Sequence, residues 1–223
     1  MGILSKIITG SPNAKSRFHT LDGECIDLAG MRYLPNSALS TVGRHLFGVR
    51  SRIPWLGYRA IRHLEKLLQP SWEMIEFGSG MSTVWFSKYV KHFYSIESNP
   101  QWFAKVKADF ERRGIDNITY KLCEGLDYAE AAHIPDNSID FILVDGVMRH
   151  PCMHTSLKKV KPGGWIYLDN ADKPGSDPPG DITMAEQVLV DYAKQHNTPI
   201  ETFIDFIPTN FFVTKGLLVQ INK

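Results

Sequence analysis

Residues 74–86 read MIEFGSGMSTVWF and mark a point where a buried strand turns into a helix. The apolar run reaches Glu76, two glycines follow at Gly78 and Gly80, and helical character resumes at Ser82. Glycines allow a tight turn, and a helix that begins directly after such a turn offers its first N–H groups to a negative ligand group. The stretch therefore predicts a ligand site at the carboxyl end of a strand.

Strand-like and helix-like segments alternate along most of the chain. This alternation, with continuous apolar strands, predicts an α/β fold: a doubly wound, mostly parallel sheet with helices on both faces. The last two strands are too close in sequence for a crossover helix, so we expect them to pair antiparallel. The expected strands are 72–77, 93–98, 117–125, 139–146, 165–170, 201–207 and 211–222, and the expected helices are 55–69, 82–92, 99–114, 127–133, 151–160 and 183–195. We expect Asn99 to cap the start of the 99–114 helix and Gly114 to end it.

Length and composition limit the classes of protein that fit. The 223 residues suit one domain, 51–223, preceded by an irregular extension, 1–50, which we expect to form a lid or a wall of the acceptor site. The 25 basic and 24 acidic residues nearly cancel, which disfavours a nucleic-acid or membrane partner. Three separated cysteines and the lack of a signal peptide or membrane-spanning run predict a cytoplasmic protein. The sequence is compatible with a homodimer.

The residues around residues 78–80, here called the glycine turn, restrict the chemical class of the ligand. A dinucleotide fingerprint is incomplete because Thr83 stands at the third glycine position, and the GK[ST] of a P-loop is absent. Glu97 ends the next strand about 20 residues later, where an acid can accept hydrogen bonds from ribose hydroxyls. The pattern favours a ligand with a ribose and a carboxylate but no pyrophosphate. S-adenosylmethionine fits this description.

From about Pro54 to its end, the chain resembles the class I S-adenosylmethionine-dependent methyltransferases. The resemblance implies a Rossmann-like sheet of seven strands with a reversed C-terminal strand. The segments that carry it are EFGSGMST (76–83), SIESNP (95–100), EGLDY (124–128), ILVDG (142–146) and KPGGWIYLDNAD (161–172).

The same resemblance assigns a cofactor site. It implies that the glycine turn lines the methionine moiety, Glu97 holds the ribose, Leu126 or Asp127 meets the adenine edge, and Glu76 orients the amino-acid end. The predicted cofactor-binding residues are Glu76, Gly78, Ser79, Gly80, Ser82, Glu97, Ser98, Leu126, Asp127 and Asp145.

The VDG and LDN segments resemble the metal-binding positions of catechol-type O-methyltransferases. The resemblance implies that Asp145, Asp169 and Asn170 hold Mg²⁺, which would lower the pKa of an acceptor hydroxyl. The lysine expected three residues after the aspartate is Met148, so Arg149 or His150 would substitute; His150 and Asp145 are the predicted catalytic residues. In the alternative interpretation, Asp145 contacts the amino group of the cofactor, and the Asp-Asn pair only ends a strand.

The segment RIPWLGYRAIRHLE (52–65) also resembles small bacterial methyltransferases linked to glycan or secondary-metabolite pathways. The expected function is therefore O-methylation of a small hydroxylated molecule: a sugar, a glycan precursor or a secondary metabolite. No NPPY-like segment follows the fourth strand, which disfavours a nucleic-acid base as acceptor. Two alternatives remain: a non-catalytic module that binds an adenosyl ligand, and an aminopropyl-transferase-like enzyme.

Overall fold

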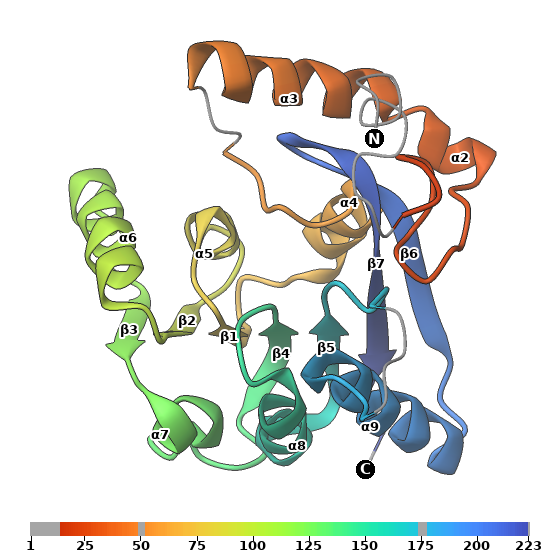
Figure 1. Ribbon diagram of the computed structural model, residues 1–223. Helices are drawn as coiled ribbons and strands as arrows, with labels where there is room; N and C mark the ends of the chain where they lie inside the picture. Colours follow the sequence, from red (N-terminus) through yellow and green to blue (C-terminus); the bar gives the residue numbers. More distant parts are fainter. Residues whose placement is uncertain (1–13, 49–51, 174–177, 223) are drawn as a thin grey trace.

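The computed structural model describes residues 14–48, 52–173 and 178–222, and its centre is a seven-stranded sheet (Figure 1). The strand order is β3-β2-β1-β4-β5-β7-β6. Neighbours from β3 to β5 pair in parallel, whereas β7 is antiparallel to both β5 and β6. The strands are β1 (Glu73–Phe77), β2 (His92–Glu97), β3 (Ile118–Leu122), β4 (Ile139–Val144), β5 (Val160–Leu168), β6 (Ile200–Ile207) and β7 (Asn210–Gln220). The predicted doubly wound sheet and its reversed strand are confirmed.

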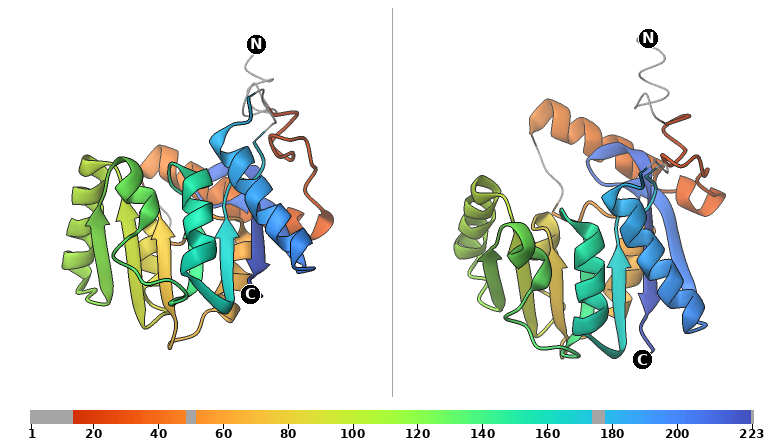
Figure 2. Two further views of the ribbon diagram at one scale, coloured as in Figure 1. Left: turned by 90° about the horizontal axis from the view of Figure 1, so that it is seen from below. Right: turned by 60° about the horizontal axis from the view of Figure 1, so that its bottom comes forward.

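Helices cover both faces of this sheet (Figures 1 and 2). One face carries α4 (Tyr58–Leu67), α5 (Met81–Phe86) and α6 (Pro100–Arg113). The other carries α7 (Gly125–Glu130), α8 (Arg149–Lys159) and α9 (Asp181–Gln195). Successive residues of β1 face opposite sides of the sheet, each covered by its own hydrophobic core. Met74 packs in the core under α4 and α5, and Ile75 packs in the core under α7, α8 and α9. None of the described helices is both long and apolar enough to cross a membrane.

Local signals set the ends of the helices near the glycine turn. Asn99 accepts a hydrogen bond from the backbone N–H of Trp102 at 2.9 Å, and Gly114 ends α6 at φ 62°, as the sequence predicts. In contrast, α5 ends at Phe86, shorter than expected. The Asn117 side chain donates to the carbonyls of Ser87 and Val90, which holds the chain after α5 in a turn.

The extension differs from the irregular segment expected there. It contains α2 (Leu28–Met31) and the 14-residue α3 (Leu34–Phe47). The inward side of α3 is polar, because the Ser37 hydroxyl donates to the carbonyls of Ile207 at 3.1 Å and Asn210 at 3.0 Å. Its outward side is apolar, with Leu39 73% and Leu46 71% exposed. A helix with its polar side inward lacks the usual pattern of apolar residues facing a core.

The described part of the extension is anchored to the last two strands. Ile26 and Tyr33 share a hydrophobic cluster with Phe206 of β6 and Val213 of β7. The ammonium group of Lys215 pairs with Asp22 and Glu24. Residues 18–33 therefore contribute to a core that β6 and β7 also build. The domain boundary near residue 50 and the lid role stay predictions.

Candidate active site

The loops after β1 and β4 meet at two glycines. Gly78 has φ 95°, and a Cβ there would lie 2.6 Å from the Cα of Gly146. A Cβ on Gly146 would lie 1.9 Å from the hydroxyl of Tyr128. Both positions therefore require glycine, because the two backbones touch at the switch point of the sheet. Gly80 is less restricted, since a Cβ there would meet only the Ser82 hydroxyl at 3.6 Å.

The predicted ribose acid, Glu97, is already bonded to the glycine turn. Its Oε2 accepts the Ser79 N–H at 3.0 Å and the Ser79 hydroxyl at 2.7 Å. Its Oε1 accepts the backbone N–H groups of Ser98 and Asn99, both at 2.8 Å. Two bonds to each oxygen satisfy the carboxylate. A ribose bound at Glu97 would have to replace one or both of the Ser79 contacts.

Ser79 is held from two further sides. Its hydroxyl lies 2.6 Å from that of Tyr120, and its carbonyl accepts the indole N–H of Trp102 at 2.6 Å. The sequence analysis missed Trp102. The available signal was its position as the third residue of the helix that follows Glu97.

Glu76 lies buried below the turn. Its Oε2 accepts the hydroxyls of Thr83 at 2.5 Å and Ser95 at 3.1 Å, while its Oε1 has no recorded partner. Burial raises the pKa of Glu76 to about 8, and the hydroxyls of Ser82, Thr83 and Ser95 only partly offset this effect. At neutral pH the group is therefore mostly a neutral acid, and a nearby cation would favour its ionised form.

A cavity of about 170 Å³, here called the turn cavity, opens above the glycine turn. Among the described residues that line it, Asp145 is the one carboxyl group, and its side chain is 28% exposed. Leu126 and Asp127 lie exposed in the first turn of α7 and do not line this cavity. The lining residues are Trp55, Ser79, Gly80, Met81, Ser82, Trp102 and Asp145.

The three predicted metal ligands lie around an arginine. Arg149 is 6% exposed, and its Nη2 is 3.1 Å from Asp145 Oδ1 and 3.3 Å from Asn170 Oδ1. Its Nε donates to the carbonyl of Gly146 at 2.9 Å, and its Nη1 donates to the carbonyl of Asp169. A buried positive charge is therefore already present at the ends of β4 and β5.

The carboxyl groups of Asp145 and Asp169 influence each other's ionisation. Burial raises the pKa of Asp145 and, further, that of Asp169, while the charge of Arg149 acts in the opposite direction. The negative charge of Asp145 also opposes ionisation of Asp169.

The Arg149 contacts disfavour a Mg²⁺ site at this place. The guanidinium bonds both Asp145 and Asn170 and so occupies space that an ion between their oxygens would need. Within the described ranges, no group of three His, Cys, Asp or Glu side chains is placed to hold a metal ion. Metal binding by Asp145, Asp169 and Asn170 stays a prediction.

His150 begins the first turn of α8 away from the turn cavity. Its backbone N–H donates to Asp181 at 3.0 Å, and its Nε2 is 3.2 Å from the Nε2 of His154. Another histidine, His19, lines a cavity of about 350 Å³ between the extension and Asn170. The sequence analysis gave no role to His19, because nothing local connects the extension to the end of β5.

Comparison with known proteins agrees with this geometry. Residues 75–171 match a family model described as a methyltransferase domain. Together with the fold, this match supports an S-adenosylmethionine-dependent methyltransferase. The matched region contains the glycine turn, Glu97 and the β4–β5 loops. No curated protein matches this methyltransferase.

Solved structures of O-methyltransferases share the fold of this methyltransferase. One from Bacillus cereus, in complex with SAH, is 16% identical, with 84% of this chain and 98% of that chain covered and a TM-score of 0.63. TomG from Streptomyces achromogenes, involved in tomaymycin synthesis and in complex with SAM, is 14% identical, with 84% and 90% covered and a TM-score of 0.63. A putative O-methyltransferase from Klebsiella pneumoniae is 16% identical, with 89% and 91% covered and a TM-score of 0.62.

Proposed function

We propose that this methyltransferase transfers the methyl group of S-adenosylmethionine to a hydroxyl of a small molecule and that Asp145 accepts the hydroxyl proton. The observation that carries the proposal is the position of Asp145, the one carboxyl group lining the turn cavity among the described residues. A base that works near neutral pH needs a pKa near that range, and burial raises the pKa of Asp145.

The surrounding residues have distinct roles in this proposal. The glycine turn and Ser82 bind the methionine part, and Glu97 accepts the ribose after the Ser79 contacts open. Leu126 and Asp127 remain the proposed contacts of the adenine edge, with Ser98 beside the ribose. The unpartnered oxygen of Glu76 supports its role near the amino-acid end.

Bound S-adenosylmethionine would supply a methyl group on a positively charged sulfur and would leave as S-adenosylhomocysteine once the acceptor oxygen has taken that group. Asp145 would accept the proton that the acceptor hydroxyl loses. Arg149 holds the Asp145 side chain in place and balances its charge.

We propose that the transfer proceeds without bound Mg²⁺, since Arg149 supplies positive charge where the ion was expected. Full activity in EDTA is the expected result. Loss of activity in EDTA with recovery in Mg²⁺ or Mn²⁺ would contradict this part of the proposal. The absence of nucleic-acid and membrane partners, the homodimer and the cytoplasmic location remain predictions.

A mass-spectrometric screen of hydroxylated metabolites with labelled S-adenosylmethionine tests the reaction. It separates methyl transfer from aminopropyl transfer by the mass gained, and from simple binding by the presence of product.

Once an acceptor is found, Asp145→Asn should lower kcat by about 10²- to 10⁴-fold, the usual range for a lost acid–base group. His150→Gln should change kcat by less than about threefold, because His150 does not line the turn cavity. Equal losses in both variants would favour the predicted role of His150.

A further inference from the structure

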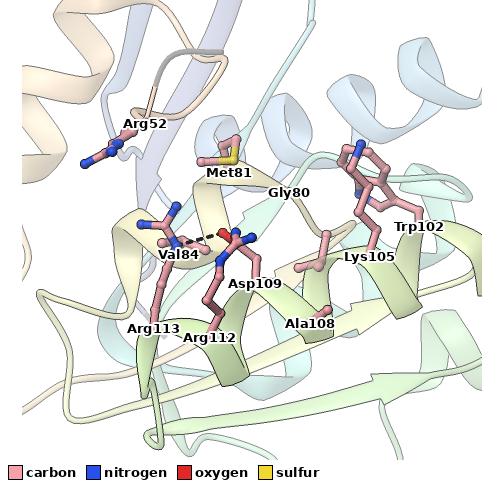
Figure 3. A pocket seen from close by; sticks show the side chains of 11 residues that line it. Arg52, Gly80, Met81, Val84, Trp102, Lys105, Ala108, Asp109, Arg112 and Arg113 are labelled. Carbon is pink, nitrogen blue, oxygen red and sulfur yellow. Dashed lines mark hydrogen bonds and ion pairs between the residues drawn. The ribbon is translucent and has the colours of Figure 1, made fainter. Parts of the chain in front are cut away.

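A groove of about 430 Å³ lies between α5 and α6, next to the glycine turn (Figure 3). Its inner wall includes the apolar side chains of Met81 and Val84 on α5. The α6 side chains, including Lys105 and Arg112, project from one side of that helix toward α5. The groove is larger than the turn cavity, and the cofactor residues described above leave most of its walls without a role.

Positive charge is concentrated in this groove. Arg52, Lys105, Arg112 and Arg113 line it together with one acid, Asp109. The whole chain has 25 basic and 24 acidic residues, so this excess is local. Asp109 pairs with Arg112 and, at 2.8 Å, with Arg113. Each guanidinium is a fork of several N–H donors, so one carboxylate leaves donors available on both arginines.

The end of a helix explains only part of this arrangement. Arg112 and Arg113 occupy the last turn of α6, where cations interact favourably with the helix dipole. Lys105 lies two turns earlier, and Arg52 comes from the segment before α4. The helix dipole does not account for either of these residues. Their presence in the same groove indicates an anionic ligand.

The groove adjoins the turn cavity. The two share Gly80, Met81 and Trp102 as lining residues. Trp102 is fixed at this junction by its bond to the Ser79 carbonyl, and the Lys105 ammonium lies 5.0 Å from the centre of its ring. The cavity beside His19 shares no lining residue with the turn cavity. Among the described cavities, the groove is thus the one that shares walls with the turn cavity, where methyl transfer is proposed.

We propose that this groove binds a phosphate or diphosphate group of the methyl acceptor, whose hydroxyl then reaches the turn cavity. The inference rests on the proposed function and narrows its acceptor to phosphorylated hydroxy compounds. Four cations against one acid match the two or more negative charges of such a group, whereas a simple carboxylate carries one. Arginine forks also suit phosphate oxygens, which accept two parallel hydrogen bonds.

Calorimetry with inorganic pyrophosphate, in the presence of S-adenosylhomocysteine, tests the groove. The groove variant is Lys105→Gln/Arg112→Gln, which leaves the Arg113–Asp109 pair in place. The matched control is Lys91→Gln/Lys107→Gln, which removes the same charge from exposed positions outside the groove. Circular dichroism checks the fold of each protein, and all three proteins are titrated with S-adenosylmethionine as well.

We expect pyrophosphate affinity to fall roughly 10- to 100-fold in the groove variant and less than twofold in the control, as for lost hydrogen bonds to a charged group. Affinity for S-adenosylmethionine should be the same in all three proteins. Pyrophosphate that does not bind the parent protein, or that binds both variants equally, overturns the groove proposal while leaving the proposed function intact. Failure of S-adenosylmethionine to bind the parent protein would instead contradict the proposed function.

In activity assays, a phosphorylated acceptor should be methylated and its dephosphorylated form should not; the reverse preference also overturns the proposal.

Discussion

The two halves of the carboxyl edge of the sheet satisfy their buried acids differently. At β1 and β2, Glu97 is bonded to backbone N–H groups and the Ser79 hydroxyl, and Glu76 is bonded to two hydroxyls. At β4 and β5, the guanidinium of Arg149 bonds the Asp145 carboxyl group and the backbone carbonyl of Asp169. The first half uses neutral donors that a ligand can replace, whereas the second contains its own cation. The β1–β2 half is therefore suited to exchange partners with the cofactor, and the β4–β5 half to keep its geometry.

Removal of the cation should have the largest effect. Arg149→Met leaves the buried Asp169 and the partly buried Asp145 without their positive partner, so we expect stability to fall by about 3–5 kcal/mol in urea unfolding. Arg62→Met, at an exposed position on α4, is the control and should change stability by less than about 0.5 kcal/mol. If any cation can stabilise the β4–β5 half, Mg²⁺ should raise the Tm of Arg149→Met but not that of the parent protein. A loss below about 1 kcal/mol would remove the contrast between the two halves.

The next effect is the pH dependence caused by Glu76. The folded protein keeps this carboxyl protonated up to about pH 8, whereas the unfolded chain releases the proton near pH 4.5. Stability from this group is therefore complete below pH 4.5 and is lost as the pH rises toward 8. Glu76→Gln cannot ionise, so the parent protein should lose about 4 kcal/mol relative to this variant between pH 4.5 and 9. Parallel stability curves for the two proteins would show that the pKa of Glu76 is not raised.

A smaller effect is expected on cofactor binding. Glu97→Ala should weaken S-adenosylmethionine by about 1.5–3 kcal/mol, because hydrogen bonds to a charged group are lost. Glu124→Ala, at an exposed position after β3, should leave the affinity unchanged. Calorimetry that finds the same affinity in both variants would exclude Glu97 from the ribose site.

The smallest effect should come from the hydroxyl that competes with the ribose. Ser79→Ala removes one of the four bonds to Glu97, so we expect S-adenosylmethionine to bind about threefold more tightly, which corresponds to ~0.5–1 kcal/mol. Ser71→Ala is the control, since Ser71 is exposed ahead of β1 and lies outside the cofactor site. Weaker binding in Ser79→Ala would mean that the hydroxyl contacts the cofactor directly.

The features predicted correctly from the sequence are those encoded locally. The glycine turn, the caps of α6 and the antiparallel β6–β7 pair each depend on residues close together in the chain. The sequence indicated Arg149 only as a substitute for the missing lysine. Its bonds to Asp169 and Asn170 could not be predicted, because they depend on the spacing between the loops after β4 and β5. Gly146 stood in the quoted VDG segment, but its contact with Gly78 appears only when β1 and β4 pair. The α3 helix was missed because Pro35 and Gly43 favour turns, although Pro35 lies in the first turn of the helix, where proline is tolerated.

The anchoring of the extension on β6 and β7 has a consequence for how the chain is made. Arg17 donates to the carbonyl of Phe211, 194 residues later, and Asp22 pairs with Lys215, 193 residues later. A ribosome that adds 5–20 residues per second needs roughly 10–40 s to make the chain between these partners. Throughout that time the extension has no strand to dock on, while the β1–β5 part can already form. The side of the molecule that begins the sequence is therefore completed last.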